Sequence, residues 1–315
     1  MKNTLYMVIP CYNEKEVLHE TAIRLKQVYL KLVDSNKINK KSKIVFINDG
    51  SQDTTWEIIK ELHEKDIMFS GINLSRNKGH QNALLAGLLT VKDYSDMVIS
   101  MDADLQDDIN AIEEMVDKHL EGFDIVYGVR SKREKDTLFK RYTAESYYKL
   151  LNAIGGEVIY NHADYRLMSK RTIEELSKFK EVNIFLRGIV PMLGFSSTTV
   201  SYERNERLAG ESKYPFKKML SFAIEGITSL SVKPIRIISS LGISIFVVSI
   251  LMLVYIIVRH QMGNTVTGWA SVAVSVWAIG GLVLLSLGII GEYIGKIYLE
   301  TKERPKFIIK EFINE

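Results

Sequence analysis

The sequence has almost no cysteine and little excess of charge. Its 315 residues include one cysteine, Cys11, which cannot form a disulfide within the chain, and no Cys and His spacing typical of a zinc site occurs. We therefore expect the main domain to lie in a reducing compartment, which points to the cytoplasm. The formal net charge is only +3 and the Lys and Arg residues are dispersed, so a nucleic-acid partner is not expected.

The first residues, MKNTLYMVIPCYNE, lack the long apolar core and the small-residue cleavage site of a signal peptide. They are better explained as a first strand, and we expect that the soluble part is not exported. No internal repeat or low-complexity segment is present. With 46% hydrophobic and 25% charged residues, the chain can form one sizeable soluble domain and an accessory region.

Two long uncharged stretches, residues 237–258 and 268–291, stand out in the C-terminal part. Each is long enough to cross a hydrocarbon core of about 30 Å. Soluble core helices rarely stay uncharged over such lengths, so we set that alternative aside. Basic residues flank the pair and favour a multi-pass plasma-membrane protein with both flanks cytoplasmic. These residues are Lys217, Lys218, Lys233 and Arg236 before the pair, and Lys296, Lys302, Arg304 and Lys306 after it.

These stretches set the expected domain boundaries. We expect a soluble domain over residues 1–215, an interfacial amphipathic helix over 216–234, two transmembrane helices over 235–295 and a cytoplasmic tail over 296–315. An ordinary surface helix is the alternative for residues 216–234. Glycines in the second stretch allow close helix contacts within the pair or between protomers, so a homo-oligomer stays open.

Within the soluble domain, short apolar runs alternate with segments of helical periodicity. The expected strands are residues 5–9, 44–47, 67–74, 97–101 and 123–127, and the expected helices are residues 14–32, 54–65 and 78–91. This order predicts an α/β fold with a mostly parallel sheet, in which ligands bind at the carboxyl ends of the strands. Four polar motifs stand at those ends: PCYNE, NDGSQDTT, SRNKGHQN and DADLQDD. Their shared position indicates one active site.

The last motif crowds Asp102, Asp104, Asp107 and Asp108 into one segment, which is costly unless a cation neutralises them. Side chains two residues apart on a strand leave on the same face, so Asp102 and Asp104 can hold one octahedral ion, Mg²⁺ or Mn²⁺. Acidic loops are more often solvated surface. The position directly after an apolar strand favours the metal.

The other motifs offer groups for a nucleotide. Tyr12 can pack against a base, Glu14 can reach a ribose, and Asp49 can accept a hydrogen bond from a base N–H or a ribose hydroxyl. Asp53 is better explained as a cap of the next helix. His80 is expected to start a helix or to lie on the surface, because no second His stands at ligand spacing.

In their order and spacing, VIPCYNE, INDGSQDTT, LSRNKGHQNALLAG and MDADLQDD resemble the family 2 glycosyltransferases of GT-A fold. Within that family the likeness is to the polyprenyl-phosphate glycosyltransferases, which include dolichyl-phosphate mannose synthases and bacterial bactoprenol glucosyltransferases. It runs from residue 5 to about residue 215, and the paired C-terminal spans match the bacterial branch. The sequence departs from the pattern at Lys78, where an aromatic residue is common, and at Asp108, where Pro is common.

The resemblance implies a Rossmann-like catalytic domain and a role for each matching residue. It implies inversion at the sugar anomeric carbon. Nucleotide contacts fall on Pro10, Tyr12, Glu14 and Asp49. The metal and the diphosphate are surrounded by Asp102, Ala103, Asp104 and Gln106, with Asp102, Asp104 and Gln106 as the metal ligands.

Three later segments extend the likeness. GVRSKRE puts Arg130 where it can contact a phosphate, although surface solvation explains it equally well. ADYRLMSKR makes Asp164 the candidate carboxylate nearest the acceptor, with a helix cap or a salt bridge to Arg166 as the alternative. RNERLAGESKYPFKK resembles the acceptor loop, in which Arg207 and Lys213 can clamp the donor diphosphate or a lipid phosphate.

These features predict transfer of a single sugar to undecaprenyl phosphate at the cytoplasmic membrane face. UDP-glucose or UDP-N-acetylglucosamine is the favoured donor, with GDP-mannose as a further option. A lipid-phosphate oxygen would attack the sugar C1, with Asp164, Asp104 and Arg207 as the catalytic residues. Because a phosphate monoester is largely ionised near neutral pH, Asp164 is expected to orient it rather than to deprotonate it. A flippase or a transferase that uses the lipid-linked sugar to modify surface polysaccharide would act downstream.

Two other functions are weighed against this one. A processive polysaccharide synthase is disfavoured, because two spans cannot readily enclose a polymer channel and no QxxRW-like segment is present. A catalytically silent membrane subunit that binds a nucleotide sugar belongs to a different class. The intact DADLQ motif, Asp164 and Arg207 argue against it.

Overall fold

The computed structural model describes residues 3–131, 162–182, 185–203 and 268–314, together with scattered positions between residues 235 and 262. The chain forms two compact units. The first, here called the sheet unit, comprises Met1–Gly226 and Arg304–Glu315. The second, here called the helical unit, comprises Ile227–Glu303.

The first part of the sheet unit alternates strands and helices. The strands are β1 Leu5–Cys11, β2 Lys43–Asn48, β3 Phe69–Leu74 and β4 Met97–Ser100. The helices between them are α1 Leu18–Asp34, α2 Thr55–Lys65 and α3 His80–Val91. β1 pairs in parallel with β2 and with β4, and β2 pairs in parallel with β3. The predicted alternation and the parallel sheet are confirmed, with boundaries shifted by a few residues.

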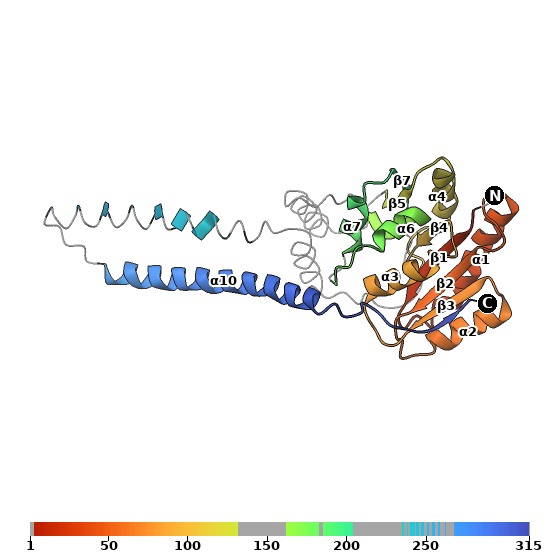
Figure 1. Cartoon of the computed structure of the whole chain (residues 1–315), viewed down its shortest axis with the longest axis horizontal. Coiled ribbons are helices and arrows are strands. Elements are labelled where there is room, and N and C mark those ends of the chain that lie inside the picture. Colours follow the sequence, from red (N-terminus) through yellow and green to blue (C-terminus); the bar gives the residue numbers. More distant parts are fainter. Residues whose placement is uncertain are drawn as a thin grey trace. The chain divides into compact units, whose positions relative to one another are not determined.

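Four further strands widen the sheet. They are β5 Ile125–Arg130, which follows helix α4 Ala111–Leu120, then β6 His162–Ser169, β7 Ser197–Tyr202 and β8 Ile309–Ile313. β6 lies antiparallel between β4 and β5, β7 lies parallel to β5, and β8 lies antiparallel to β3. Among the described residues the result is an 8-stranded mixed sheet in the order β7-β5-β6-β4-β1-β2-β3-β8 (Figure 1). Part of the predicted C-terminal tail is therefore an edge strand of this sheet.

Helices cover both faces of this sheet (Figure 1). One buried cluster joins alternate residues of the central strands to α1, α2 and α4. The other joins the opposite residues to α3 and to two short helices, α6 Lys170–Leu176 and α7 Leu186–Met192. α3 packs closely on β1, because a Cβ added at Gly87 would lie 2.4 Å from Cγ1 of Val8. The two cores fix the strand ends that carry the polar motifs.

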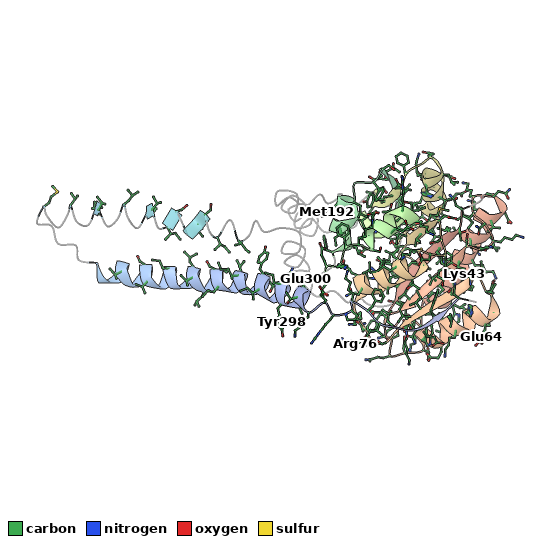
Figure 2. All side chains as sticks on the ribbon, viewed as in Figure 1. Lys43, Glu64, Arg76, Met192, Tyr298 and Glu300 are labelled. Carbon is green, nitrogen blue, oxygen red and sulfur yellow. The ribbon has the colours of Figure 1, made fainter. Side chains whose placement is uncertain are left out.

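The helical unit contains α10 Trp269–Thr301, which includes the second predicted span. Within the described residues, one segment is long and apolar enough to cross a membrane, Ile279–Thr301. The Nζ atom of Lys302 lies 4.1 Å from the ring centroid of Tyr298, which Figure 2 labels near the end of α10. Aromatic and basic side chains of this kind are typical of a membrane–water interface. The first predicted span lies mostly, and the predicted interfacial helix entirely, outside the described residues.

Candidate active site

The loops after β1 and β2 are bonded to each other. The backbone N–H of Asn13 donates to Oγ of Ser51 at 3.0 Å, and the N–H of Gln52 donates to Oδ1 of Asn13 at 2.9 Å. Asn13 adopts a left-handed conformation with φ of 53°, which Asn tolerates better than most residues. Pro10 is buried inside β1 rather than in the loop. The first two motifs therefore form one rigid surface at the end of the sheet.

Asp49 joins this surface to the loop before α3. Its carboxylate is 3% exposed and accepts the backbone N–H groups of Lys78 at 2.7 Å and Gly79 at 2.9 Å. Burial raises the pKa of Asp49, and the two hydrogen bonds oppose that rise. Gly50 follows with φ of +63°, and a Cβ there would lie 2.4 Å from the backbone N of Asn77. Asp49 thus anchors the third motif, while its contact with a nucleotide stays a prediction.

A cleft of about 430 Å³ opens over these loops. Its walls come from the ends of β1, β2 and β3, from α2 and from β8; the lining residues that matter here are Tyr12, Gly50, Trp56, Asn73, Arg76 and Lys310. The volume is within the range of small-molecule sites. Among the residues predicted to meet the nucleotide, Tyr12 lines this cleft with 36% of its surface exposed. Glu14, two residues further along the chain, is half-buried, and its backbone N–H donates to Oγ1 of Thr55 at 3.0 Å.

The acidic motif lies beyond the end of β4. Because the strand stops at Ser100, Asp102 and Asp104 are loop residues, and the expected strand geometry does not hold for them. Oδ1 of Asp104 accepts the backbone N–H of Gln106 at 3.2 Å, which forms a local turn. The Ala103 carbonyl accepts a hydrogen bond of 2.8 Å from Oγ1 of Thr21, and so ties the loop to α1. Leu105 between them has φ of 55°, an uncommon value for such a residue.

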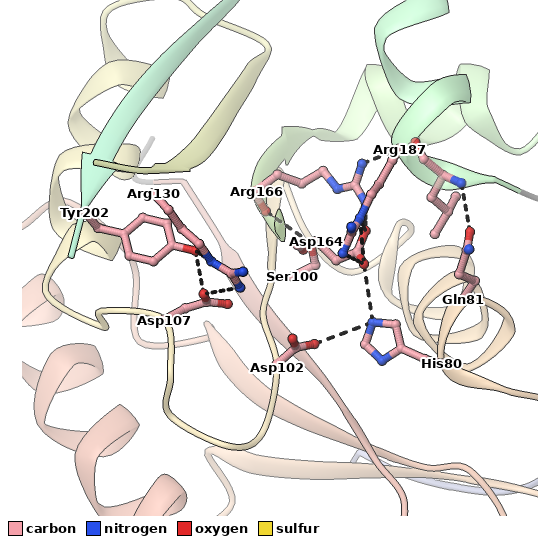
Figure 3. A network of polar contacts seen from close by, with 11 residues as sticks. His80, Gln81, Ser100, Asp102, Asp107, Arg130, Asp164, Arg166, Arg187 and Tyr202 are labelled. Carbon is pink, nitrogen blue, oxygen red and sulfur yellow. Dashed lines mark hydrogen bonds and ion pairs between the residues drawn. The ribbon is translucent and has the colours of Figure 1, made fainter. Parts of the chain in front are cut away.

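The end of this motif is neutralised by the neighbouring strands (Figure 3). Asp107 is 2% exposed; Oδ1 accepts a short hydrogen bond from the Tyr202 hydroxyl and lies 3.3 Å from Nη2 of Arg130. Burial and the Asp107 charge raise the pKa of Tyr202 far above its usual range. Arg130 also donates from Nε to the Tyr202 hydroxyl at 3.3 Å. Arg130 is therefore already paired with a carboxylate, and its contact with a phosphate stays a prediction.

Asp164 lies on β6 between two arginines (Figure 3). Side chains alternate along a strand, so Asp164 and Arg166 share the face that α3 and α7 cover. Nη2 of Arg166 donates to Oδ1 at 2.8 Å and Nη2 of Arg187, from α7, donates to Oδ2 at 2.9 Å. Burial alone would raise the pKa of Asp164, but Arg187 and Arg166 outweigh it and hold that pKa well below its usual range. The salt bridge to Arg166, which was the alternative explanation for Asp164, is present, and the role of Asp164 near the acceptor stays a prediction.

His80 stands between the two carboxylates that the sequence singled out. It is the first residue of α3, and its Nε2 lies 3.5 Å from Oδ1 of Asp102 and 3.7 Å from Oδ2 of Asp164 (Figure 3). The prediction that His80 starts a helix is confirmed, but its contact with two carboxylates could not be predicted from any motif. Its neighbour Gln81 accepts the backbone N–H of Leu186 at 2.9 Å and holds the start of α7 against α3.

The acidic loop has the chemistry of a divalent cation site. Partial burial raises the pKa of Asp102, His80 opposes the rise, and the carboxylates of Asp107, Asp164 and Asp104 add to it. The side chain of Asp102 is 40% exposed, so a ligand can reach it. Within the described residues no group of three or more His, Cys, Asp and Glu gathers as a metal site. Asp102 and Asp104 alone still suit an ion such as Mg²⁺, which takes one or two carboxylates from the protein and completes its shell with phosphate oxygens and water.

Two predicted site residues, Arg207 and Lys213, lie outside the described residues. The structure brings the other predicted residues to one end of the sheet, in three groups. Tyr12 lines the cleft over the first two motifs, Asp102 and Asp104 lie in the acidic loop, and Asp164 lies across His80 from that loop.

The mixed α/β sheet with these motifs at the strand ends has the architecture of a GT-A fold. Residues 6–177 match the model of glycosyl transferase family 2, so the chain belongs to that family and is a glycosyltransferase. The uncharacterized glycosyltransferase YkoT of Bacillus subtilis is 52% identical over 97% of this chain and 90% of its own. Bactoprenol glucosyl transferase of Shigella phage SfX is 39% identical over 96% of this chain and 97% of its own. The SfII prophage-derived bactoprenol glucosyl transferase of Shigella flexneri is 40% identical over 97% of each chain.

Proposed function

We propose that this glycosyltransferase moves one sugar from a nucleotide diphosphate sugar to undecaprenyl phosphate at the cytoplasmic face of the plasma membrane. The observation that carries the proposal is the likeness to bactoprenol glucosyl transferases over nearly the whole chain, including the residues after the catalytic sheet. UDP-glucose is the favoured donor and UDP-N-acetylglucosamine the next, while GDP-mannose remains a further option. The apolar segment Ile279–Thr301 supports a membrane location for the acceptor.

In the proposed reaction, the donor nucleoside occupies the cleft beside Tyr12 and the diphosphate lies at the acidic loop. Asp102 and Asp104, with Gln106 as the third predicted ligand, would hold a divalent cation, which would supply positive charge for the departing diphosphate. Arg130 is the candidate for a further phosphate contact. Arg207 and Lys213 complete the predicted set as the residues that clamp a phosphate.

The acceptor side relies on charge placement. An oxygen of the lipid phosphate forms a bond to C1 of the sugar while the bond from C1 to the diphosphate oxygen breaks, which inverts the anomeric centre. Asp164 is ionised and paired with two arginines, so it is a poor proton acceptor. Its proposed part is to orient Arg187, which is 40% exposed and can face a phosphate.

A lipid-labelling assay tests the proposal. Membranes that contain the protein are incubated with radiolabelled UDP-glucose, UDP-N-acetylglucosamine or GDP-mannose, with and without Mn²⁺ or Mg²⁺, and the lipid is extracted. We expect label in the lipid fraction from one donor, dependent on the cation. Label in no lipid fraction, or label in a polymer, would contradict single-sugar transfer.

The metal assignment has its own prediction. Asp104→Asn should reduce transfer by at least a hundredfold while membrane insertion stays normal, because the loss of a ligand weakens a cation whose charge stabilises the leaving group. Asp108→Asn in the same loop is the matched control and should keep most of the activity. Equal activity of the two variants would contradict the assignment of Asp104 as a metal ligand.

A further inference from the structure

The C-terminal residues return to the sheet unit and dock on it firmly. β8 pairs with β3, Oγ of Ser70 donates to the Ile313 carbonyl at 2.5 Å, and the Phe312 ring lies 6.1 Å from the Tyr94 ring. Nζ of Lys306 donates to the Phe179 carbonyl at 2.9 Å. These contacts hold the segment after α10 at a fixed register on the edge of the sheet.

This register brings Lys310 to the cleft. Lys310 lies on β8 opposite the end of β3, where the pairing shifts between Asn73 and Leu74, and all three residues line the 430 Å³ cleft. Lys310 is exposed. Three other charged side chains line the cleft: Asp53 and Arg76 come from the loops after β2 and β3, and Glu57 comes from the first turn of α2. Asp53 is already used, because it accepts the backbone N–H of Thr55 at 3.0 Å.

We propose that Lys310 is a donor-binding residue, whose ammonium group donates to a carbonyl of the nucleobase. This inference rests on the proposed use of a nucleotide sugar. A Lys ammonium carries three donors and no acceptor, so it suits the carbonyl oxygens of uracil or guanine. The donor pocket is then built from both ends of the chain, from Tyr12 to Lys310, and is complete only when β8 is paired.

The position of the cleft favours the base over the diphosphate as the partner of Lys310. Asp102 and Asp104, the proposed cation ligands, are absent from the cleft lining among the described residues. The lining instead offers an aromatic face at Tyr12, which is a typical group for a planar base, while Oδ1 of Asn73 already accepts a hydrogen bond of 2.8 Å from Asn48. A phosphate held by the cation at the acidic loop therefore lies outside this cleft.

Binding measurements on the full-length protein in detergent test the proposal. The probes are UDP, GDP, uridine and inorganic pyrophosphate, each with and without Mg²⁺, and the variants are Lys310→Met, Lys310→Arg and Glu311→Gln. We expect Lys310→Met to weaken UDP and uridine binding roughly tenfold, the lower end for a hydrogen bond from a charged donor. Glu311 is exposed on the same strand outside the cleft lining, so its variant should bind like the wild type. Lys310→Arg should recover part of the affinity.

The outcomes separate this inference from the proposed function. If the wild type binds UDP and Lys310→Met binds it equally well, the inference fails while the proposed function stands. A loss for UDP and pyrophosphate but none for uridine would assign Lys310 to a phosphate and overturn the contact with the base. If the wild type binds neither UDP nor GDP, with or without Mg²⁺, the proposed function fails as well. A melting temperature of Lys310→Met equal to that of the wild type shows that a weaker affinity does not come from unfolding.

Discussion

Replacing Asp164 with Asn should destabilise the sheet unit strongly. The change keeps the size of the side chain and removes the one negative charge between Arg166 and Arg187. Arg166 is 0% exposed, and its Nε atom has no hydrogen-bond partner among the described residues. The guanidinium group would therefore stay buried without a counter-charge.

The magnitude follows from this burial. Breaking a buried ion pair by removing one partner costs about 3–5 kcal/mol, because the remaining charge is neither solvated nor paired. For a unit of this size each kcal/mol lowers Tm by about 2–4 °C, so the melting temperature should fall by roughly 6–20 °C. Arg187→Met is the matched control. It leaves the buried pair intact and removes a side chain that is 40% exposed, for which a loss of about 1 kcal/mol or less is expected.

The assay is thermal unfolding of the purified protein, followed by a probe of the sheet unit. Equal melting temperatures for Asp164→Asn and the wild type would refute the idea that Arg166 depends on this carboxylate. If Asp164→Asn lowers the melting temperature no more than Arg187→Met does, the exposed Arg187 rather than the buried Arg166 is the main partner of Asp164. Either result would also weaken the view of Asp164 as a permanently ionised residue.

The same pair predicts how stability depends on pH. The pKa of Asp164 is depressed in the folded state by Arg187 and Arg166, against the effect of burial. Its stabilising contribution is therefore present in full above the unfolded pKa of about 3.9 and is lost as pH falls toward the folded value. The difference in Tm between wild type and Asp164→Asn should stay constant from pH 7 to pH 5 and shrink below about pH 4. A gap that disappears near neutral pH would contradict the assignment.

Two other changes test how the loops are held. Gly50→Ala should cost about 1–3 kcal/mol of stability and weaken UDP binding, because its Cβ would clash with the backbone of Asn77. Gly194 also has a positive φ, +70°, but a Cβ there would meet nothing within 4 Å. Gly194→Ala should therefore affect stability only through backbone strain and leave UDP binding unchanged. Calorimetric unfolding and UDP titration of both variants distinguish the clash from the strain. Tyr202→Phe should cost about 1.5–3 kcal/mol, since it removes a buried hydrogen bond to the Asp107 carboxylate; an unchanged Tm would contradict this.

The parallel part of the fold could be predicted because its signals are local. β1 to β4 are apolar runs and α1 to α3 have a clear helical period, so each of these elements can be predicted from its own residues. β6 could not be predicted in this way, because Asp164 and Arg166 occupy positions that face a buried layer and interrupt the apolar alternation. β8 is short and follows α10, so only the pairing with β3 identifies it as part of the sheet.

The candidate site divides in the same way. The sequence locates Asp102, Asp104 and Asp164 because each lies in a motif, but it cannot tell which charges meet. His80 and Arg187 carry no signal of their own, and they reach Asp164 only because α3 and α7 cover the same face of the sheet. Asp107 looked like part of the metal motif, yet Arg130 and Tyr202 neutralise it from β5 and β7.

These partners sort the acidic residues by what they can do. Asp164 and Asp107 are already compensated by arginine, so their charges contribute little attraction for a cation. Among the described contacts Asp102 is paired with His80 and with no arginine, and its pKa is raised because partial burial and three nearby carboxylates outweigh His80. In the proposed reaction no proton has to leave the acceptor, and negative charge moves from the lipid phosphate to the diphosphate. In the proposed site Asp102 attracts a cation while Asp164 is paired with two arginines. This arrangement suits the transfer of negative charge to the diphosphate better than it suits general-base catalysis.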